Sequence, residues 1–466
     1  HAGDTEGEYR NNRTLVTDIE QILGDEFTFE SSLEDVSRDL FGEELAIGEY
    51  STANTHFDNG ALLSEDFFNR SSMGSYAIRQ ALYTAPEAPN GPANVIEAGV
   101  SLNLANGASF SLDLSDDLLF LGDFRSQGGD FEITSARAVV FSADTVIDTR
   151  GGWFSDYEFE NEVPLVGVPR IHGGEVSISA GDAYGQEFGY PSDMGLVMPE
   201  GMTINTGGGA WVNREGHITL GRGGDITIDS AVTPGRPSIL DANLSALGLG
   251  GNGALTLKLG WDDILISDDA APEAEEGRRL RLFGSDFFEN VGFSEINLSG
   301  RSFTIGEGTQ IEASAATLTL LESFEGQSPY FAPTGTDLAL LTSLNRVSPG
   351  LRPAALRDGM AISFASNADL NPEGTYGTPN LFAVEAGSRL SVEPGGSISL
   401  LSMGALDIQG HIFAPGGDIQ LGATAIRVDA DGEINAAGVA RVLSEIRTPD
   451  GRILREGEVL AGGHIS

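Results

Sequence analysis

The stretch that decides the fold is GGSISL at residues 395–400, followed by GGDIQL at residues 416–421. Each copy opens on a Gly-Gly pair and a polar residue, after which apolar and polar residues alternate. This alternation is the period-two signature of a β-strand with one buried face, and glycine permits a tight corner with positive φ before it. The spacing of 21 residues, from 395 to 416, predicts three short strands and three corners per repeat.

The same pattern recurs along most of the chain. Further copies are GGDFEI from residue 128, GGEVSI from 173, GGDITI from 223 and GGHIS from 462. Most gaps between copies are close to one or two units of about 21 to 25 residues, which is within the range of solenoid repeats. Short strands with this spacing could form a sandwich or a propeller, but a repeat of this length favours a β-helix.

We therefore predict an all-β fold, a right-handed parallel β-helix (solenoid) with loop insertions and a partly helical N-terminal cap. Stacked coils of three short strands would point apolar side chains inward as ladders along the axis. The inward positions expected from the alternation are Phe131, Ile133, Val176, Ile178, Ile226, Ile228, Ile398, Leu400, Ile419 and Leu421.

Two regions with different patterns set the domain organisation. Residues 1–92 contain helix-compatible stretches and form the predicted cap or decoration, while residues 93–466 form the β-helix. The helix-compatible stretches are 17–23, 33–41 and 75–83, with a further short helix at 337–344. Inserts are expected at about 153–172, 182–200, 267–293 and 322–380. The copy cut off after residue 462 predicts that the native chain continues beyond residue 466.

Composition excludes several classes of function. Asp and Glu number 69 against 26 Lys and Arg, so the formal net charge is −43. A surface of this charge repels phosphate, so we expect no nucleic-acid partner and no docking to anionic membranes. Acidity fits a cationic or saline environment, or simply keeps a long exposed chain soluble. The chain has no cysteine, which suits export.

A weaker repeat carries two tryptophans. Trp153 follows a Gly-Gly pair at 151–152, and Trp211 follows GGGA at 207–210. The two residues are expected at equivalent points of two coils. They could stack on sugar rings, or each could cover the end of the core beside its glycines.

Many β-helices are polysaccharide lyases or hydrolases, so clusters of carboxylates were considered as catalytic or metal sites. The strongest candidates, Asp262, Asp263, Asp268 and Asp269, lie near Lys258 and could hold calcium or belong to a solvated loop. A second cluster is Asp116 with Asp117. The histidines are scattered without metal-ligand spacing. We expect no cofactor apart from structural Ca²⁺.

The sequence resembles the filamentous-haemagglutinin-type large exoproteins of two-partner secretion. The resemblance rests on LSVEPGGSISL (390–400), on ALDIQGHIFAPGGDIQL (405–421) and on the two Gly-Gly-Trp units. It covers roughly residues 95–466, whereas residues 1–92 do not match the family's secretion domain. It implies a secreted right-handed parallel β-helix that acts in adhesion, surface attachment or fibre formation. It supplies no catalytic residues.

The leading hypothesis is a secreted, non-enzymatic structural protein or adhesin of the bacterial cell surface, forming a rod or fibre. Its expected partners are other copies of itself or further coils of the same chain, a host-cell, matrix or polysaccharide surface, and an outer-membrane secretion partner. The alternatives are a β-helical lyase or glycoside hydrolase that degrades polysaccharides, and a self-assembling extracellular filament.

Overall fold

The structure is a computed structural model. It describes residues 14–17, 61–64, 68–69, 75–79, 94–115, 117–156, 169–181, 195–232, 236, 238–270, 272, 274, 278–320, 333–336, 347–350, 359–366, 381–447 and 453–466. These residues form an all-β protein with long parallel sheets, consistent with a β-helix or solenoid. They fall into two compact units, which are described separately.

Unit 1 comprises residues 1–151, 173–206 and 228–245 and contains three sets of parallel strands. The first set, in spatial order, is β2 (Ala61–Ser64), β1 (Thr14–Thr17), β4 (Asn94–Ile96), β7 (Leu118–Phe120), β10 (Val139–Phe141), β14 (Leu196–Met198) and β19 (Ser238–Leu240). The second is β5 (Ser101–Asn103), β8 (Asp123–Arg125), β11 (Val146–Asp148), β15 (Thr203–Asn205) and β20 (Asn243–Ser245). The third is β3 (Ser75–Arg79), β6 (Ser109–Leu114), β9 (Phe131–Ser135), β13 (Val176–Ala180) and β18 (Ile226–Ser230).

Unit 2 comprises residues 152–172, 207–227 and 246–466 and also contains three parallel sets. The first is β21 (Ala254–Ile266), β23 (Glu295–Ile305), β27 (Ala361–Ser366), β30 (Ser397–Ser402) and β33 (Asp418–Gly422). The second joins the last residues of β21 and β23 to β28 (Leu381–Val384), β31 (Ala405–Ile408) and β34 (Ala425–Val428). The third is β24 (Gln310–Ala313), β29 (Arg389–Val392), β32 (His411–Phe413) and β35 (Glu433–Asn435).

Most of the remaining elements of unit 2 lie outside these three sets. They are a lateral sheet of β12 (Trp153–Ser155), β16 (Ala210–Val212) and β17 (Ile218–Leu220), the 3-10 helix η2 (Ser285–Phe288), and the antiparallel pairs β25 (Thr317–Leu320) with β26 (Val347–Gly350) and β36 (Val439–Arg447) with β37 (Ile453–Leu460). The strand β22 (Arg279–Phe283) pairs in parallel with the last residues of β21 and so extends the second set.

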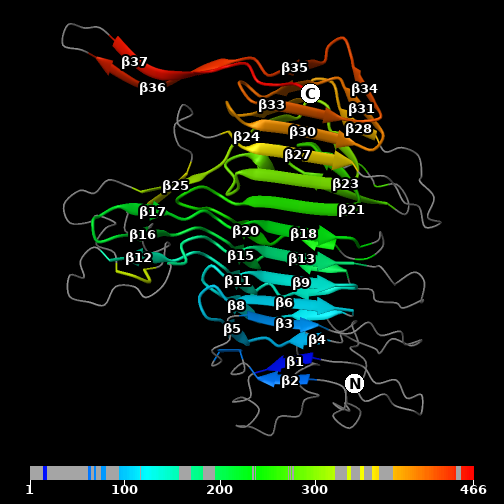
Figure 1. The fold of residues 1–466 in the computed structure, drawn as a ribbon. Helices are drawn as coiled ribbons and strands as arrows, with labels where there is room; N and C mark the ends of the chain where they lie inside the picture. Colours follow the sequence, from blue (N-terminus) through cyan, green and yellow to red (C-terminus); the bar gives the residue numbers. More distant parts are fainter. Residues whose placement is uncertain are drawn as a thin grey trace. The chain divides into compact units, whose positions relative to one another are not determined.

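In both units the chain visits the three sets in turn and then returns to the first set, one strand further along. We call one such passage a rung. In unit 1, β4, β5 and β6 form a rung, and each pairs in parallel with its counterpart in the next rung, β7, β8 and β9. In unit 2, β30, β31 and β32 are followed in the same way by β33, β34 and β35. Figure 1 shows the rungs of each unit lying one above another. The predicted parallel stack of short strands is confirmed.

The alternation of apolar residues correctly placed the core. Nine of the ten residues expected inward are at most 1% exposed, and Leu421 alone is half-buried. Leu421 pairs with the buried Leu400 on one side, and its backbone N–H donates to the carbonyl of Ser466 at the chain's last residue. Each rung thus buries its apolar side chains against neighbouring rungs, which offsets the conformational entropy that a single rung could not offset alone.

Each unit also holds a stack of phenylalanines in its core. In unit 1 the ring centroids of Phe124 and Phe131 lie 4.8 Å apart, and those of Phe110 and Phe131 lie 5.9 Å apart. In unit 2 Phe303 stacks on Phe364 at 4.7 Å and on Phe382 at 4.8 Å. Phe110 and Phe131 are opposite each other in paired strands, as are Phe303 and Phe382, so parallel pairing brings these like residues together and their rings stack.

The two glycines of the corner motif have different tasks. The first supplies positive φ in three copies, since φ is 63° at Gly128, 84° at Gly395 and 62° at Gly416. The second is buried where successive rungs touch. A Cβ on Gly174 would fall on the carbonyl oxygen of Gly129, and a Cβ on Gly417 would fall on that of Gly396. The predicted positive φ therefore explains only the first glycine, and close approach of two backbones explains the second.

The acidic residue after the glycines links one rung to the next. The Asp130 carboxylate accepts a hydrogen bond from the backbone N–H of Glu175 at 3.0 Å. Asp418 accepts from the N–H of His464 at 3.1 Å in the same way. A charged acceptor strengthens such a bond, so part of the chain's acidity stabilises the stack.

The partly helical cap is unconfirmed: among the described residues of the N-terminal region, Phe68 and Asn69 are helical and the other assigned elements are strands. Residues 75–83 were expected to be helical, but Ser75–Arg79 form strand β3, which pairs in parallel with β6. Tyr76 is 6% exposed and lies opposite the buried Phe110, so sheet pairing outweighs the local helical pattern. The other expected helices, at 17–23, 33–41 and 337–344, lie outside the described residues except for Thr17, which ends strand β1.

Three of the expected inserts contain strands that belong to the parallel stack or pair with it. Leu196–Met198 within 182–200 form β14, and Ala361–Ser366 within 322–380 form β27. Arg279–Phe283 within 267–293 form β22, which pairs with β21. The predicted ranges therefore include short strands that pair with the stack, and the insert boundaries stay a prediction.

Replacement of a buried second glycine tests the stack. We expect Gly417→Ala to lower the free energy of unfolding by about 2–4 kcal/mol, since the added methyl group meets the backbone of the next rung. Gly260→Ala is the matched control, because a Cβ there meets nothing within 4 Å. Chemical denaturation of the three proteins measures the difference, and equal stabilities would contradict the close approach.

Candidate functional site

The lateral sheet of unit 2 separates the two tryptophans that the sequence placed together. β12 pairs in parallel with β16, with Trp153 opposite Ala210 and Phe154 opposite Trp211. The tryptophans are therefore offset by one residue, and in a strand this offset reverses the face to which a side chain points. The expectation that Trp153 and Trp211 occupy equivalent points is wrong, because the second glycine-rich segment is longer.

Trp153 is a core residue. It is 1% exposed and packs in a hydrophobic cluster with Ala210, Val212, Leu249 and Leu318. A buried indole offers no face to a sugar, so Trp153 is excluded as a stacking platform. Its role is the other one considered from the sequence, which is to cover the core beside its glycines.

Trp211 points away from this cluster and is half-buried. Its indole Nε1–H donates a hydrogen bond to Oδ2 of Asp156 at 3.0 Å, which fixes the orientation of the ring. Phe154 lies opposite Trp211 on β12, and the exposed Thr219 lies opposite it on β17. Trp211 thus stays in place as an oriented aromatic side chain with polar neighbours.

Asp262 is a buried charge neutralised by two arginines. It is 0% exposed and lies within the register shift of β21 between Leu259 and Asp263. Arg279 Nη2 lies 2.6 Å from Asp262 Oδ1, and Arg281 Nη2 lies 3.1 Å from Oδ2. The parallel register of β22 with β21 places Arg279 directly opposite Asp262. A fully buried carboxylate requires such partners.

Asp263 is held by a second pair of basic side chains. Arg301 forms an ion pair with it, Ser302 donates a hydrogen bond to it, and Arg278 lies 3.8 Å from its Oδ2. The four arginines were visible in the sequence as separate residues. Their convergence depends on the register of β22 and β23 with β21, which the sequence pattern did not indicate.

The other acidic candidates are placed differently. Asp268 is exposed and accepts a hydrogen bond from the backbone N–H of Ser285 at 2.8 Å, and Asp269 is also exposed. Asp117 is 5% exposed and accepts from the N–H of Ala138 at 3.0 Å, which marks a structural corner, whereas Asp116 lies outside the described residues. The structure does not gather these carboxylates around one point.

The described residues hold no cluster typical of a metal site. Within that part of the chain, no group of three or more His, Asp or Glu side chains is arranged to hold a metal ion. The Asp262 and Asp263 carboxylates face guanidinium groups, which fits ion pairing better than calcium coordination. No described helix is long and apolar enough to cross a bilayer. Structural calcium elsewhere stays a prediction.

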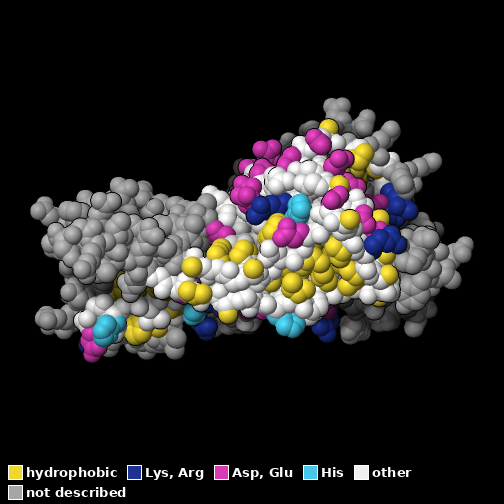
Figure 2. All heavy atoms as spheres, turned by 90° about the horizontal axis from the view of Figure 1, so that it is seen from above, with side chains coloured by type: hydrophobic (Ala, Val, Ile, Leu, Met, Phe, Trp, Pro, Cys, Tyr) yellow, Lys and Arg dark blue, Asp and Glu magenta, His cyan; other side chains and the backbone are white. Residues whose placement is uncertain are grey.

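The last described rung of unit 2 presents apolar side chains at its open edge. Ile426 and Val428 of β34 continue the columns of the buried Leu406 and Ile408, yet each is 46% exposed. Ile465 bridges to Ile419 and is 48% exposed. Seen from above, apolar side chains gather on this face beside acidic side chains and arginines (Figure 2).

Comparisons with known proteins give this chain no relatives. No family model, no curated protein and no solved structure matches it. Its resemblance to the filamentous-haemagglutinin type therefore stays a prediction, and its function is inferred from its own residues.

The Asp262 cluster yields a stability prediction. We expect Asp262→Asn to lower the free energy of unfolding by about 3 kcal/mol, because two nearly buried guanidinium groups lose their counter-charge. The exposed Asp269→Asn should change it by less than about 0.5 kcal/mol. Equal unfolding midpoints for both variants in a denaturant titration would contradict the assignment.

Proposed function

We propose that the chain is a right-handed parallel β-helix exported to the bacterial cell surface, where it acts as a non-enzymatic attachment protein. Its stacked rungs would be the scaffold, and its inserts would be the contact surface. The resemblance to filamentous-haemagglutinin-type exoproteins, the absence of cysteine and the strong acidity all agree with this proposal.

The observation that carries the proposal is the way unit 2 accommodates its additional elements. The antiparallel pair β25–β26 lies between β24 and β27 in the sequence and leaves the rungs, yet β23, β27, β30 and β33 keep an unbroken parallel register around it. A scaffold that accepts insertions at its edges without loss of register is suited to presenting binding surfaces.

The enzymatic alternative has less support. Hydrolysis of glycosides needs two carboxylates facing each other across a groove, roughly 5 to 9.5 Å apart. The strongest carboxylate pair in the sequence, Asp262 and Asp263, is instead engaged by arginines, and Asp262 has no exposed surface. Such a pair contributes to folding rather than to substrate chemistry.

The proposal is tested with the purified protein on beads. Coated beads should adhere to cell monolayers and polysaccharide-coated glass more than beads coated with the heat-unfolded chain. In parallel, soluble polysaccharides incubated with the protein should yield no new reducing ends and no unsaturated uronates. Failure of the beads to adhere would remove the attachment role. Product formation that scales with protein concentration would favour the enzyme.

A further inference from the structure

We propose that the outer face of the lateral sheet β12–β16–β17 is a binding site for a neutral polysaccharide, with Trp211 as its stacking platform. This inference rests on the proposed attachment function and names the class of ligand that one of its surfaces would take. The site is built from two parallel rows of side chains, one mainly aromatic and the other polar.

The first row is fixed by the register of the three strands. Phe154, Trp211 and Thr219 lie opposite one another across the sheet. Phe154 is 7% exposed and supports the row from below the surface, while Trp211 and Thr219 reach solvent. An indole held on its outer face by a sheet offers a flat apolar surface, which suits the apolar face of a pyranose ring.

The second row consists of residues just past the strand ends, with Asp156 after β12, and Asn213 and His217 on either side of the β16–β17 turn. The pairing continues there, since the backbone N–H of Asp156 donates to the carbonyl of Val212 and that of Asn213 to the carbonyl of His217, each at 2.9 Å. Alternation therefore places these side chains on the face of the first row. Asn213 Oδ1 accepts hydrogen bonds from the backbone N–H groups of Glu215 at 3.0 Å and His217 at 2.8 Å. Its carboxamide is therefore oriented, and its NH₂ group can donate to a hydroxyl.

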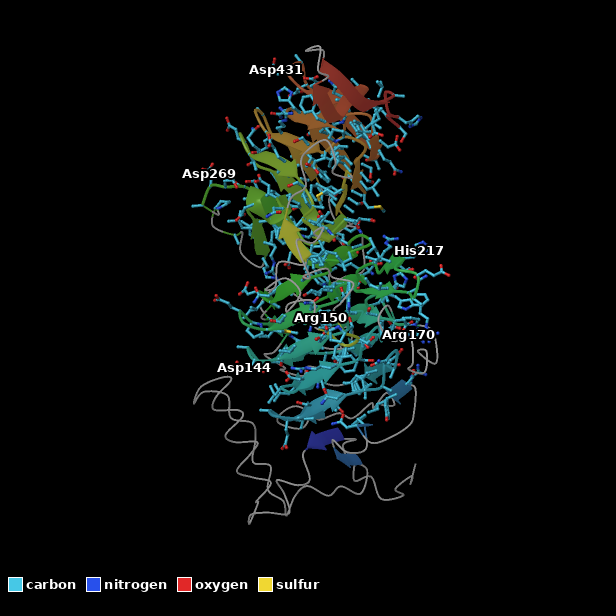
Figure 3. The ribbon with its side chains drawn as sticks, turned by 90° about the vertical axis from the view of Figure 1, so that its left-hand side faces the viewer. Asp144, Arg150, Arg170, His217, Asp269 and Asp431 are labelled. Carbon is cyan, nitrogen blue, oxygen red and sulfur yellow. The ribbon has the colours of Figure 1, made fainter. Side chains whose placement is uncertain are left out.

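The remaining members of the polar row complete a set of donors and acceptors. Asp156 uses Oδ2 to hold the Trp211 indole, and its Oδ1 can accept a hydroxyl proton. The His217 side chain is 78% exposed, and Figure 3 shows it at the outer edge of the ribbon. The site therefore places the flat indole of Trp211 beside the oriented carboxylate of Asp156 and carboxamide of Asn213. This arrangement suits a ligand that has one apolar face and hydroxyl groups around its edge.

The charge of the site decides which polysaccharide it would take. Asp156 lies at the indole edge, and Glu215 Oε2 lies 3.5 Å from His217 Nδ1. The same turn carries one exposed basic residue, Arg214, but the whole chain carries a formal charge of −43. Uronate or sulfate groups would therefore meet repulsion at low ionic strength. A neutral glycan avoids this repulsion, and its hydroxyl groups can form hydrogen bonds with Asp156 and Asn213.

The test measures binding of the full chain to soluble neutral polysaccharides, namely hydroxyethylcellulose, galactomannan and dextran, by affinity electrophoresis. At least one should retard the wild-type protein, while polygalacturonate and alginate should not. Trp211→Ala should weaken that binding about tenfold or more, because the stacking surface is lost. Phe413→Ala, which removes a half-buried aromatic residue from β32, is the matched control and should bind as the wild type does.

A second readout keeps the test decisive if Trp211→Ala fails to fold. Trp211 is one of the chain's three tryptophans. Because the ligand would contact Trp211, its binding should change the tryptophan fluorescence of the wild-type protein. Trp211→Phe should abolish that change and leave the unfolding midpoint unaltered. Undiminished binding by a folded Trp211→Ala variant would overturn the site, as would preference for the anionic polymers or no binding to any neutral one.

The bead assay separates this inference from the attachment function. If Trp211→Ala beads adhere as wild-type beads do and soluble glycan binding is also unchanged, the inference fails and attachment stands. If Trp211→Ala loses soluble glycan binding but wild-type beads adhere to no surface, the site stands and attachment fails.

Discussion

The contact on which the structure depends is the one between the backbones of successive rungs at the second glycine of each corner. Gly129 with Gly174 in unit 1 and Gly396 with Gly417 in unit 2 leave no room for a Cβ between them. Because the backbones meet there, the strand that follows starts at a fixed position against the previous rung. Ladders of like residues, such as the stacked rings of Phe303 and Phe382, follow from that position.

Part of the chain's acidity stabilises the stack. Asp130 and Asp418, which follow the corner glycines, accept hydrogen bonds from backbone N–H groups of the next rung. Asp262 and Asp263 form ion pairs with arginines. These carboxylates stabilise the stack, and other described carboxylates, such as Asp268 and Asp269, are exposed. On the proposed function, binding would fall to elements outside the rungs, among them the lateral sheet with Trp211.

The sequence predicted correctly those features that depend on the local alternation of apolar residues. It did not predict features that depend on the register with a strand remote in the sequence. Alternation alone placed Phe131, Ile226 and Ile398 in the core. It could not place Trp153 and Trp211 on opposite faces, because that depends on a register set by loops of unequal length. It also missed the arginines around Asp262, since β22 becomes a strand only when it pairs with β21. Ser75–Arg79 looked helical for the same reason, as its neighbour in the sheet is remote in sequence.

The register between rungs can be tested most directly by disulfide cross-linking, because the natural chain contains no cysteine. Glu132 on β9 lies opposite Ser177 on β13, and both point outward. Adjacent strands lie about 4.8 Å apart, within the Cα separation that a disulfide spans, whereas a partner two residues out of register lies beyond it. The account predicts that Glu132→Cys with Ser177→Cys cross-links readily under mild oxidation, and that Thr134→Cys with Ser177→Cys does not. Preferential cross-linking of the second pair, or equal cross-linking of both, would contradict the stacked register.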